Sequence, residues 1–230
     1  MLVTLATRTF TPEPTAAALR LGALARALAA GGDRVRVLTS RLAPSVARDA
    51  RQSADGGAEL GAGSGLVEVR RAPVLRDRTG AVRGYVSYMS FDLPLLARLL
   101  TGPRPDVVVS EPPPTTGAAV RIACAARRIP YVYYCADIVS DAAALAGVPG
   151  LVVRAVAGLE SFALRGARRV IAVSDGVASR ARDLGARDVV VVPNGVRVPD
   201  AVATGTPEGF PACDGPVFVY AGTVAQWLAP

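Results

Sequence analysis

The sequence contains neither lysine nor histidine, and all 26 of its basic residues are arginine. Histidine is the commonest general base and metal ligand, so its absence excludes a Ser-His-Asp triad and a histidine-built zinc site. The three cysteines, Cys124, Cys135 and Cys213, are far apart and odd in number, which predicts no disulfide framework and no zinc knuckle. We therefore expect buried, reduced thiols, with no metal and no cofactor.

Aromatic residues are also scarce, at 5%, and they are not interleaved with the arginines. This pattern gives little support to nucleic-acid binding, and we expect no nucleic-acid partner. No uninterrupted apolar run reaches the roughly 18 residues of a spanning helix. The longest candidate, 142–159, contains Pro149 and Arg154, and the opening MLVTLATRTF lacks the basic region of a signal peptide. We expect a cytoplasmic protein, soluble or peripheral at a membrane.

What the chain does have is apolar residues and positive charge. Of its 230 residues 51% are hydrophobic, the mean hydropathy is +0.34, and the net charge is +7. A large core is therefore possible. The excess of arginine has two interpretations that the composition leaves open. One is the codon usage of a GC-rich genome, and the other is a basic surface that attracts phosphate-bearing ligands or an anionic membrane face.

Strand and helix patterns alternate along the chain. The expected strands are short apolar runs at 2–6, 34–39, 66–70, 107–109, 131–135, 169–173 and 189–192. The expected helices are at 15–30, 85–100 (interrupted by Pro94), 115–128, 151–165 and directly after Ser174. Residues 41–65 lack periodicity, and we expect a mobile surface loop there.

The strands read as continuous Val, Ile and Tyr runs, which is typical of a parallel sheet covered on both faces. The fold class expected is therefore α/β, a doubly wound parallel sheet of Rossmann-like type. We expect this domain over residues 1–196 and an interdomain linker over the proline-rich residues 197–215. Residues 216–230 (PVFVYAGTVAQWLAP) would then be the first strand and glycine turn of another domain.

In an open parallel sheet, ligands bind beyond the carboxyl ends of the strands. This rule selects the loops that follow five of the strands, and their polar residues are Arg8, Glu13, Thr15, Ser110, Glu111, Thr115, Asp137, Asp141, Ser174, Asn194 and Gly195. Most have an alternative role. Thr15, Thr115 and Ser174 are plausible helix caps, Asn194-Gly195 a tight turn, and Glu13 and Glu111 solvated loop acids. Asp137 is the strongest functional candidate because it directly follows a buried strand.

Two familiar nucleotide-binding patterns are missing from these loops. No P-loop is present, and no G-x-G-x-x-G follows the first strand. The glycine-rich DGGAELGAGSG at 55–65 has neither a strand before it nor a helix after it. We interpret it as a flexible loop and not as a phosphate site.

The order of motifs resembles the N-terminal half of a retaining glycosyltransferase of the GT-B fold, family 4, in the group of O-antigen and capsule sugar transferases. The matching segments are FTPEPTAAALRLGALARALAAGGDRVRVLT at 10–39, DVVVSEPPPTTGAAVRIACAARRIPYVYYCAD at 106–137, ALRGARRVIAVSDGVASRARDLGARDVVVVPNGV at 163–196 and PVFVYAGTV at 216–224. Together they span nearly the whole chain, and the third is the most specific.

The resemblance implies two Rossmann-like domains facing a cleft, the first binding the acceptor and the second a UDP- or GDP-sugar, with no metal generally needed. It implies that Glu13 to Thr15 form the acceptor-side loop after the first strand. It places Asp137 near the reacting sugar, as the catalytic residue. The residues expected to bind the acceptor are Arg8, Glu13, Thr15, Ser110, Glu111, Thr115, Asp141 and Ser174. The resemblance assigns donor binding to Asn194, Gly195, Gly222 and Thr223. The expected acceptor is a lipid-linked or polysaccharide precursor, at the inner face of the plasma membrane.

The sequence departs from the family pattern at several points. The first loop has Pro14-Thr15-Ala16 in place of a Gly-Gly pair, no histidine follows the fifth strand, and TVAQWLAP supplies neither the Arg nor the Lys that usually follows the glycine turn. The E-x7-E pair that holds the donor is absent. We therefore expect a chain cut off at the start of the donor domain and inactive alone. Two alternatives remain open: a nucleotide-sugar epimerase of GT-B fold, and a non-catalytic module that binds an acceptor or a partner.

Overall fold

The fold was analysed in a computed structural model, which describes residues 1–52, 66–77, 82, 85–195 and 215. Seven strands form one sheet, and in chain order they are β1 (Leu2–Ala6), β2 (Arg34–Ser40), β3 (Val67–Ala72), β4 (Val107–Ser110), β5 (Tyr131–Cys135), β6 (Arg169–Ala172) and β7 (Val189–Val191). Their spatial order is β3-β2-β1-β4-β5-β6-β7, and every neighbouring pair is parallel. The predicted doubly wound parallel sheet is confirmed.

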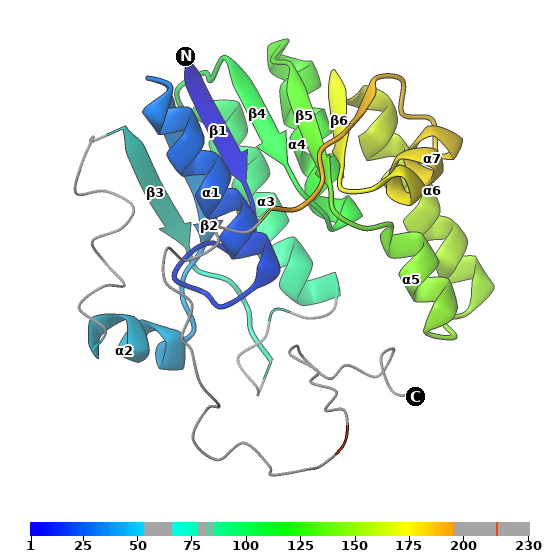
Figure 1. The fold of residues 1–230 in the computed structure, drawn as a ribbon, viewed down its shortest axis with the longest axis horizontal. Coiled ribbons are helices and arrows are strands. Elements are labelled where there is room, and N and C mark those ends of the chain that lie inside the picture. Colours follow the sequence, from blue (N-terminus) through cyan, green and yellow to red (C-terminus); the bar gives the residue numbers. More distant parts are fainter. Residues whose placement is uncertain (53–65, 78–81, 83–84, 196–214, 216–230) are drawn as a thin grey trace. The chain divides into compact units, whose positions relative to one another are not determined.

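The helices flank this sheet on both faces. They are α1 (Ala16–Ala30), α2 (Pro44–Gln52), α3 (Tyr85–Thr101), α4 (Pro114–Arg127), α5 (Val139–Leu145), α6 (Gly150–Gly166) and α7 (Asp175–Asp183). In Figure 1, α1 lies in front of β1 and β2, whereas α3 and α4 lie behind the sheet. All the strand arrows point the same way, so the loops after the strands gather at one edge, the carboxyl edge.

The core is divided by the sheet into two layers. In β1, Val3 and Leu5 face a cluster that includes Leu21 of α1, whereas Ala6 joins the larger cluster that α3, α4 and α6 form on the other face. The second layer is tight around Gly117 of α4. A Cβ atom on that residue would come within 2.6 Å of Tyr133 and 2.8 Å of Ala163, so only glycine allows this approach.

Three local expectations were wrong. Residues 44–52 form α2 and not a mobile loop, because Pro44 presets the first helical turn and Ala and Arg are good helix formers. Pro94 does not interrupt α3, because the buried side chains of Phe91, Leu95 and Leu99 hold the helix on the core despite the lost hydrogen bond. The short helix α5 was not expected at all.

The chain divides into two compact units, 1–193 and 194–230. Of the second unit, the structure describes only Asn194, Gly195 and Gly215. The expected strand and turn at 216–230, with Gly222 and Thr223, and the expected linker therefore lie outside the described residues. The domain boundary at 196 stays a prediction.

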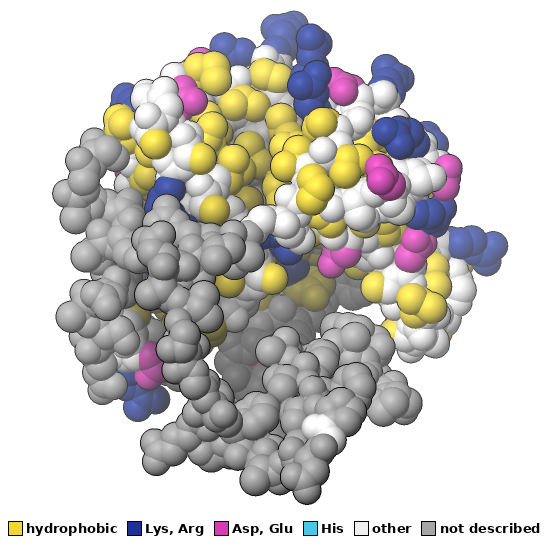
Figure 2. Space-filling model, in the orientation of Figure 1, with side chains coloured by type: hydrophobic (Ala, Val, Ile, Leu, Met, Phe, Trp, Pro, Cys, Tyr) yellow, Lys and Arg dark blue, Asp and Glu magenta, His cyan; other side chains and the backbone are white. Residues whose placement is uncertain are grey.

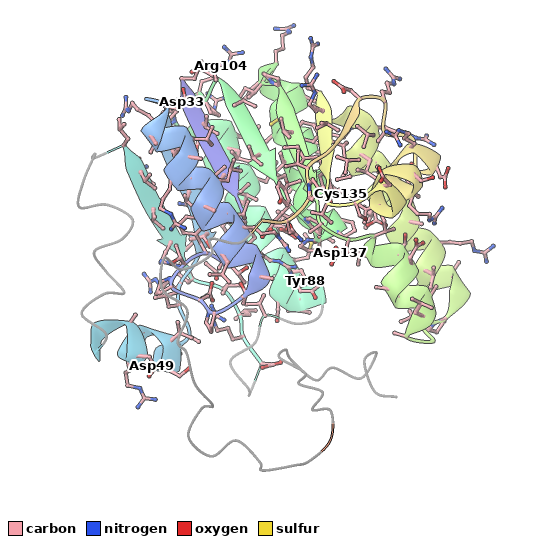
Figure 3. All side chains as sticks on the ribbon, viewed as in Figure 1. Asp33, Asp49, Tyr88, Arg104, Cys135 and Asp137 are labelled. Atoms are coloured by element: carbon pink, nitrogen blue, oxygen red, sulfur yellow. The ribbon has the colours of Figure 1, made fainter. Side chains whose placement is uncertain are left out.

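Arginine side chains gather along the amino edge of the sheet, at the top of Figure 2. Arg104 belongs to this edge (Figure 3) and donates hydrogen bonds to the carbonyl oxygens of Arg127 and Arg128, where α4 ends. Basic side chains are favoured at this position because the carbonyl end of a helix is negative. Among the described residues, no helix is long and apolar enough to cross a membrane.

Candidate functional site

A pocket of about 430 Å³ opens at the carboxyl edge, beside the point where the sheet order reverses between β1 and β4. Ligands bind at such switch points in open α/β sheets, because the loops after the two central strands diverge there. The pocket is lined by Arg8, Thr9, Glu13, Thr15, Ala17, Arg20, Arg76, Val82, Glu111, Pro112, Ala136 and Asp137. Figure 3 shows Asp137 and Tyr88 at this edge, opposite Asp33 and Arg104.

Glu111 is the most deeply buried acid of the pocket, with 5% of its surface exposed. Its carboxyl group lies within hydrogen-bonding distance of the Thr7 hydroxyl, which is also 2.8 Å from the carbonyl oxygen of Thr9. A hydroxyl has one hydrogen, so Thr7 cannot donate to both oxygens. Both contacts are satisfied when Glu111 is protonated and donates to Thr7, which in turn donates to Thr9.

Electrostatics favour the same protonated state. Burial raises the pKa of Glu111 from 4.5 to about 7, and the Thr7 hydrogen bond and the positive charges of Arg20 and Arg8 only partly oppose this. The nearby Asp137 carboxylate adds a small further rise. Glu111 therefore gains and loses its proton near neutral pH, and it can exchange a proton with a bound ligand.

Glu13 is also buried, with 8% of its surface exposed. Its carboxylate accepts a hydrogen bond of 3.0 Å from the backbone N–H of Phe10 and forms an ion pair of 3.6 Å with Arg76. It thus closes the loop that joins β1 to α1. The interpretation of Glu13 and Glu111 as solvated loop acids was wrong for both, because this loop folds back over the end of the sheet.

Two arginines reach the pocket from different elements, and each is held against an aromatic ring. The guanidinium of Arg8 lies 3.9 Å from the ring centre of Tyr88 on α3, and that of Arg20 on α1 lies 5.9 Å from the ring centre of Tyr134 on β5. Nη1 of Arg8 and Nε of Arg20 are buried, and neither atom has a hydrogen-bond partner in the part of the chain that the structure describes. An unpaired buried donor costs about 1–3 kcal/mol, so both atoms are available to a ligand.

Asp137 is an exposed residue that follows β5 after Ala136. Loss of hydration raises the pKa of its carboxyl group, and the charge of Arg20 opposes the rise. The pocket thus brings together five of the predicted site residues: Arg8, Glu13, Thr15, Glu111 and Asp137. A carboxyl group that titrates near neutrality beside two arginines can bind and orient a polar, charged or hydroxyl-bearing ligand.

Two of the three suggested helix caps are confirmed. The hydroxyl of Thr15 accepts from the N–H of Ala18 at the start of α1, and that of Ser174 accepts from the N–H of Val177 at the start of α7. Thr115 is not a cap, because α4 begins with Pro114 after Pro113, which has no side-chain acceptor. Thr15 alone of these lines the pocket.

The remaining predicted residues lie outside the pocket lining. The hydroxyl oxygen of Ser110 is buried and has no hydrogen-bond partner within the described ranges. Asp141 forms a two-oxygen pair with Arg180, at 2.7 and 2.8 Å. Asn194 and Gly195 are exposed after β7, and Gly195 lacks the positive φ of a tight Asn-Gly turn. No group of metal-ligating side chains occurs among the residues that the structure describes. Cys124 and Cys135 are free and buried, as expected.

Sequence reasoning missed several residues that shape the site. Arg20 faces the pocket from the second turn of α1, and Arg76 comes from the loop after β3, whereas only the first residues after each central strand were considered. Tyr88 was missed because it holds Arg8 from α3, remote in sequence. The signal for Arg20 is its position: it follows the predicted N-cap Thr15 by five residues, so it belongs to the first two turns of α1, at the end that faces the pocket.

The comparisons with known proteins fit this geometry. The family model of the glycosyl transferase 4-like domain matches residues 15–195. Among solved structures, sucrose-phosphate synthase from Thermosynechococcus elongatus has a TM-score of 0.59 and 14% identity, covering 85% of this chain and 48% of that one. HepE of Anabaena, in complex with UDP, has a TM-score of 0.52 and 19% identity, covering 85% and 44%.

A plant protein has the same fold. UGT89C1 of Arabidopsis thaliana, complexed with UDP-L-rhamnose, has a TM-score of 0.53 and 12% identity, covering 90% of this chain and 55% of that one. The chain thus spans about half the length of these structures. No curated protein matches it. Its parallel sheet and its match over residues 15–195 show that the chain belongs to the glycosyl transferase 4-like domain family.

Proposed function

We propose that this chain is the acceptor-binding half of a glycosyltransferase that moves a sugar from a UDP- or GDP-sugar to a lipid-linked or polysaccharide precursor. The observation that carries the proposal is the pocket at the switch point between β1 and β4, in a chain of this family. Its walls offer carboxyl groups and arginines, which suit the hydroxyl groups of a sugar and a charged neighbour. The complexes of HepE with UDP and of UGT89C1 with UDP-L-rhamnose support a nucleotide-sugar as the donor.

In this proposal Asp137 is the residue closest to the reacting sugar. It stands at the rim of the pocket after β5, where a carboxylate can orient an acceptor hydroxyl or stabilise positive charge on the transferred sugar. Glu111 lies deeper and accepts or donates a proton on the acceptor side. The chain spans about half of the solved structures it resembles, so we assign donor binding to a second domain and expect little transfer by residues 1–230 alone.

We also propose that the protein works at an anionic membrane surface. The supporting observation is the tip formed by the end of α5 and the start of α6, residues 142–153, which contain no charged side chain. Leu145 and Leu151 are 87% and 74% exposed there, and Arg154 follows directly. Apolar side chains beside basic ones favour the interface of an anionic bilayer.

The test is an NMR titration of the ¹⁵N-labelled full chain with three probes: UDP-glucose, GDP-mannose and a short-chain polyprenyl diphosphate N-acetylglucosamine. The lipid-linked sugar is expected to shift the amides of the loops after β1, β4 and β5, and the nucleotide sugars much less. Vesicles of phosphatidylglycerol, added afterwards, are expected to broaden the signals of 142–153. Asp137→Asn should weaken the response to the lipid-linked sugar, and Asp183→Asn, on exposed α7, is the matched control.

Two results would contradict the proposal. Tighter binding of a nucleotide-sugar at these loops would make this the donor half or a nucleotide-sugar epimerase. Turnover of UDP-glucose or GDP-mannose by residues 1–230 at the rate of two-domain glycosyltransferases would show that no second domain is needed.

A further inference from the structure

The two arginines of the pocket carry an inference beyond acceptor binding in general. The guanidinium group of Arg8 packs 3.9 Å from the ring centre of Tyr88, which restricts its orientation before any ligand arrives, and that of Arg20 lies 5.9 Å from the ring centre of Tyr134. Arg8 Nη1 and Arg20 Nε are buried, and neither has a partner among the described residues. A planar guanidinium in a fixed position suits the oxygens of a phosphate or carboxylate.

The charges of the pocket leave room for an anion. Of the three arginines in its lining, Arg76 forms an ion pair with Glu13. No ion pair with a carboxylate within 4.0 Å forms at Arg8 or Arg20 in the part of the chain that the structure describes. With Glu111 protonated, the charge of Arg20 is near the carboxylate of Asp137 and that of Arg8 is near the carboxylate of Asp92 on α3. Neither pair is close enough to form an ion pair, and the remaining acid of the lining, Glu13, is paired with Arg76.

We propose that Arg8 and Arg20 bind an anionic group of the acceptor, so that the acceptor class is a sugar that carries a phosphate, a diphosphate or a carboxylate. This inference rests on the proposed function, because it takes the pocket to be the acceptor site. The chemistry shared by these groups is a set of oxygens bearing negative charge, and it has two sources in an acceptor: the diphosphate of a lipid carrier and the carboxylate of an acidic sugar.

The proposal also makes binding depend on pH. An anion next to Glu111 favours the protonated form of that acid, so binding takes up a proton and weakens as the pH rises through the pKa of Glu111, about 7. Four ionisable groups face Glu111 from the packed elements. These are Arg8 after β1, Arg20 on α1, Tyr133 on β5 and Asp137 after β5. The pKa of Asp137 is also raised by burial, so an anion bound beside Asp137 would favour protonation of this acid as well and would likewise bind more tightly at lower pH.

The experiment is calorimetric titration of the full chain at pH 6 and pH 8 with pyrophosphate, glucuronate, glucose and UDP. Pyrophosphate or glucuronate is expected to bind, and glucose, which is neutral, is not. Binding should be several-fold tighter at pH 6. The stronger of the two anions identifies the source: pyrophosphate points to a carrier diphosphate and glucuronate to an acidic sugar.

Three variants sharpen the test. Arg20→Gln should lower the affinity for the anion by about tenfold or more, because a charge-assisted contact is lost. Arg26→Gln, two turns along α1 on its exposed side, should change it less than about twofold. Glu111→Gln keeps the side-chain shape and a hydrogen for Thr7 but cannot ionise, so the ratio of the affinities at pH 6 and pH 8 should fall in this variant, whatever its absolute affinity.

The proposal is overturned if neither anion binds, or if Arg20→Gln and Arg26→Gln bind equally well. It is also overturned if UDP alone binds in an Arg20-dependent way, because the site would then hold the donor. These results are distinct from failure of the proposed function. Loss of the arginine effect with intact binding of the lipid-linked sugar rejects only the anion site, whereas Arg20-dependent pyrophosphate binding without any response to the lipid-linked sugar rejects only the acceptor assignment.

Discussion

Two buried glutamates, Glu111 directly after β4 and Glu160 on α6, differ in the number of hydrogen-bond donors around them. Glu160 of α6 is 1% exposed, and its carboxylate accepts hydrogen bonds from the backbone N–H groups of Val139 and Ser140 and from the Ser140 hydroxyl, at 2.8, 3.1 and 2.6 Å. Glu111 is 5% exposed, and within the described residues its carboxyl group has one hydrogen-bond partner, the hydroxyl of Thr7. Burial is therefore similar, and the number of donors differs.

The difference separates a structural role from a chemical one. Three donors stabilise a negative charge, and they place Glu160 at the positive end of α5, which has no capping side chain of its own at Ile138. Burial raises the pKa of Glu111 to about 7, because the hydroxyl of Thr7 and the charges of Arg20 and Arg8 compensate the lost hydration of its carboxylate only in part. A buried acid thus indicates a proton-exchanging site when its donors are few.

Of the substitutions considered, replacement of Glu160 is expected to change the stability most. Glu160→Ala removes the acceptor for three donors and leaves the start of α5 unsatisfied, so the free energy of unfolding should fall by about 3–5 kcal/mol. Urea denaturation followed by circular dichroism measures this change. Ser161→Ala, at the next position of α6, loses one hydrogen bond, to Leu184, and is the control. A loss below about 1 kcal/mol for Glu160→Ala would mean that water replaces the carboxylate.

Glu111 should show a smaller effect that depends on pH. Its pKa rises from 4.5 in the unfolded chain to about 7 in the fold, so between these values the folded state holds a proton that the unfolded chain has lost. The stabilisation is complete below pH 4.5 and is lost as the pH rises through 7. This loss amounts to roughly 3 kcal/mol for the wild type.

Glu111→Gln cannot ionise and should escape that loss. Unfolding in urea at pH 5 and pH 8 checks it: the variant should gain stability relative to the wild type at pH 8 and not at pH 5. Other acids with raised pKa values, such as Asp92 and Asp137, titrate in both proteins and cancel in the difference. A constant difference between the two proteins across this range would show that Glu111 is ionised throughout.

The two acids also illustrate which features of the fold and the site can be predicted from the sequence and which depend on tertiary contacts. The sheet could be predicted because each strand is a continuous apolar run, and Asp137 could be placed because it follows such a run directly. Glu160 could not be assigned a role, because its partners at 139 and 140 belong to another helix, α5, which the sequence did not predict. Burial of Glu111 depends on the β1–α1 loop, whose path is set by tertiary contacts such as the hydrogen bonds that Ser40 and Arg71 donate to the carbonyl oxygens of Arg8 and Thr11.

The smallest loss of stability is expected for the two helix caps, Thr15 at the pocket and Ser174 away from it. Thr15 and Ser174 each accept one backbone hydrogen bond, of 3.1 and 3.3 Å, at the start of α1 and α7, and only Thr15 lines the pocket. Thr15→Ala and Ser174→Ala should each lower the free energy of unfolding by about 1 kcal/mol, because either change leaves one helix donor unsatisfied. Thermal unfolding monitored by circular dichroism measures both losses.

The two variants are expected to lose similar stability, so ligand affinity is the measurement that should distinguish them. Thr15→Ala is expected to weaken binding of the polyprenyl diphosphate N-acetylglucosamine by several-fold, since the hydroxyl stands at the pocket wall beside the positive end of α1. Ser174→Ala should leave that affinity unchanged. Equal affinities in the two variants would show that Thr15 only caps α1. The acceptor would then be bound by the arginines and carboxyl groups of the pocket, without Thr15.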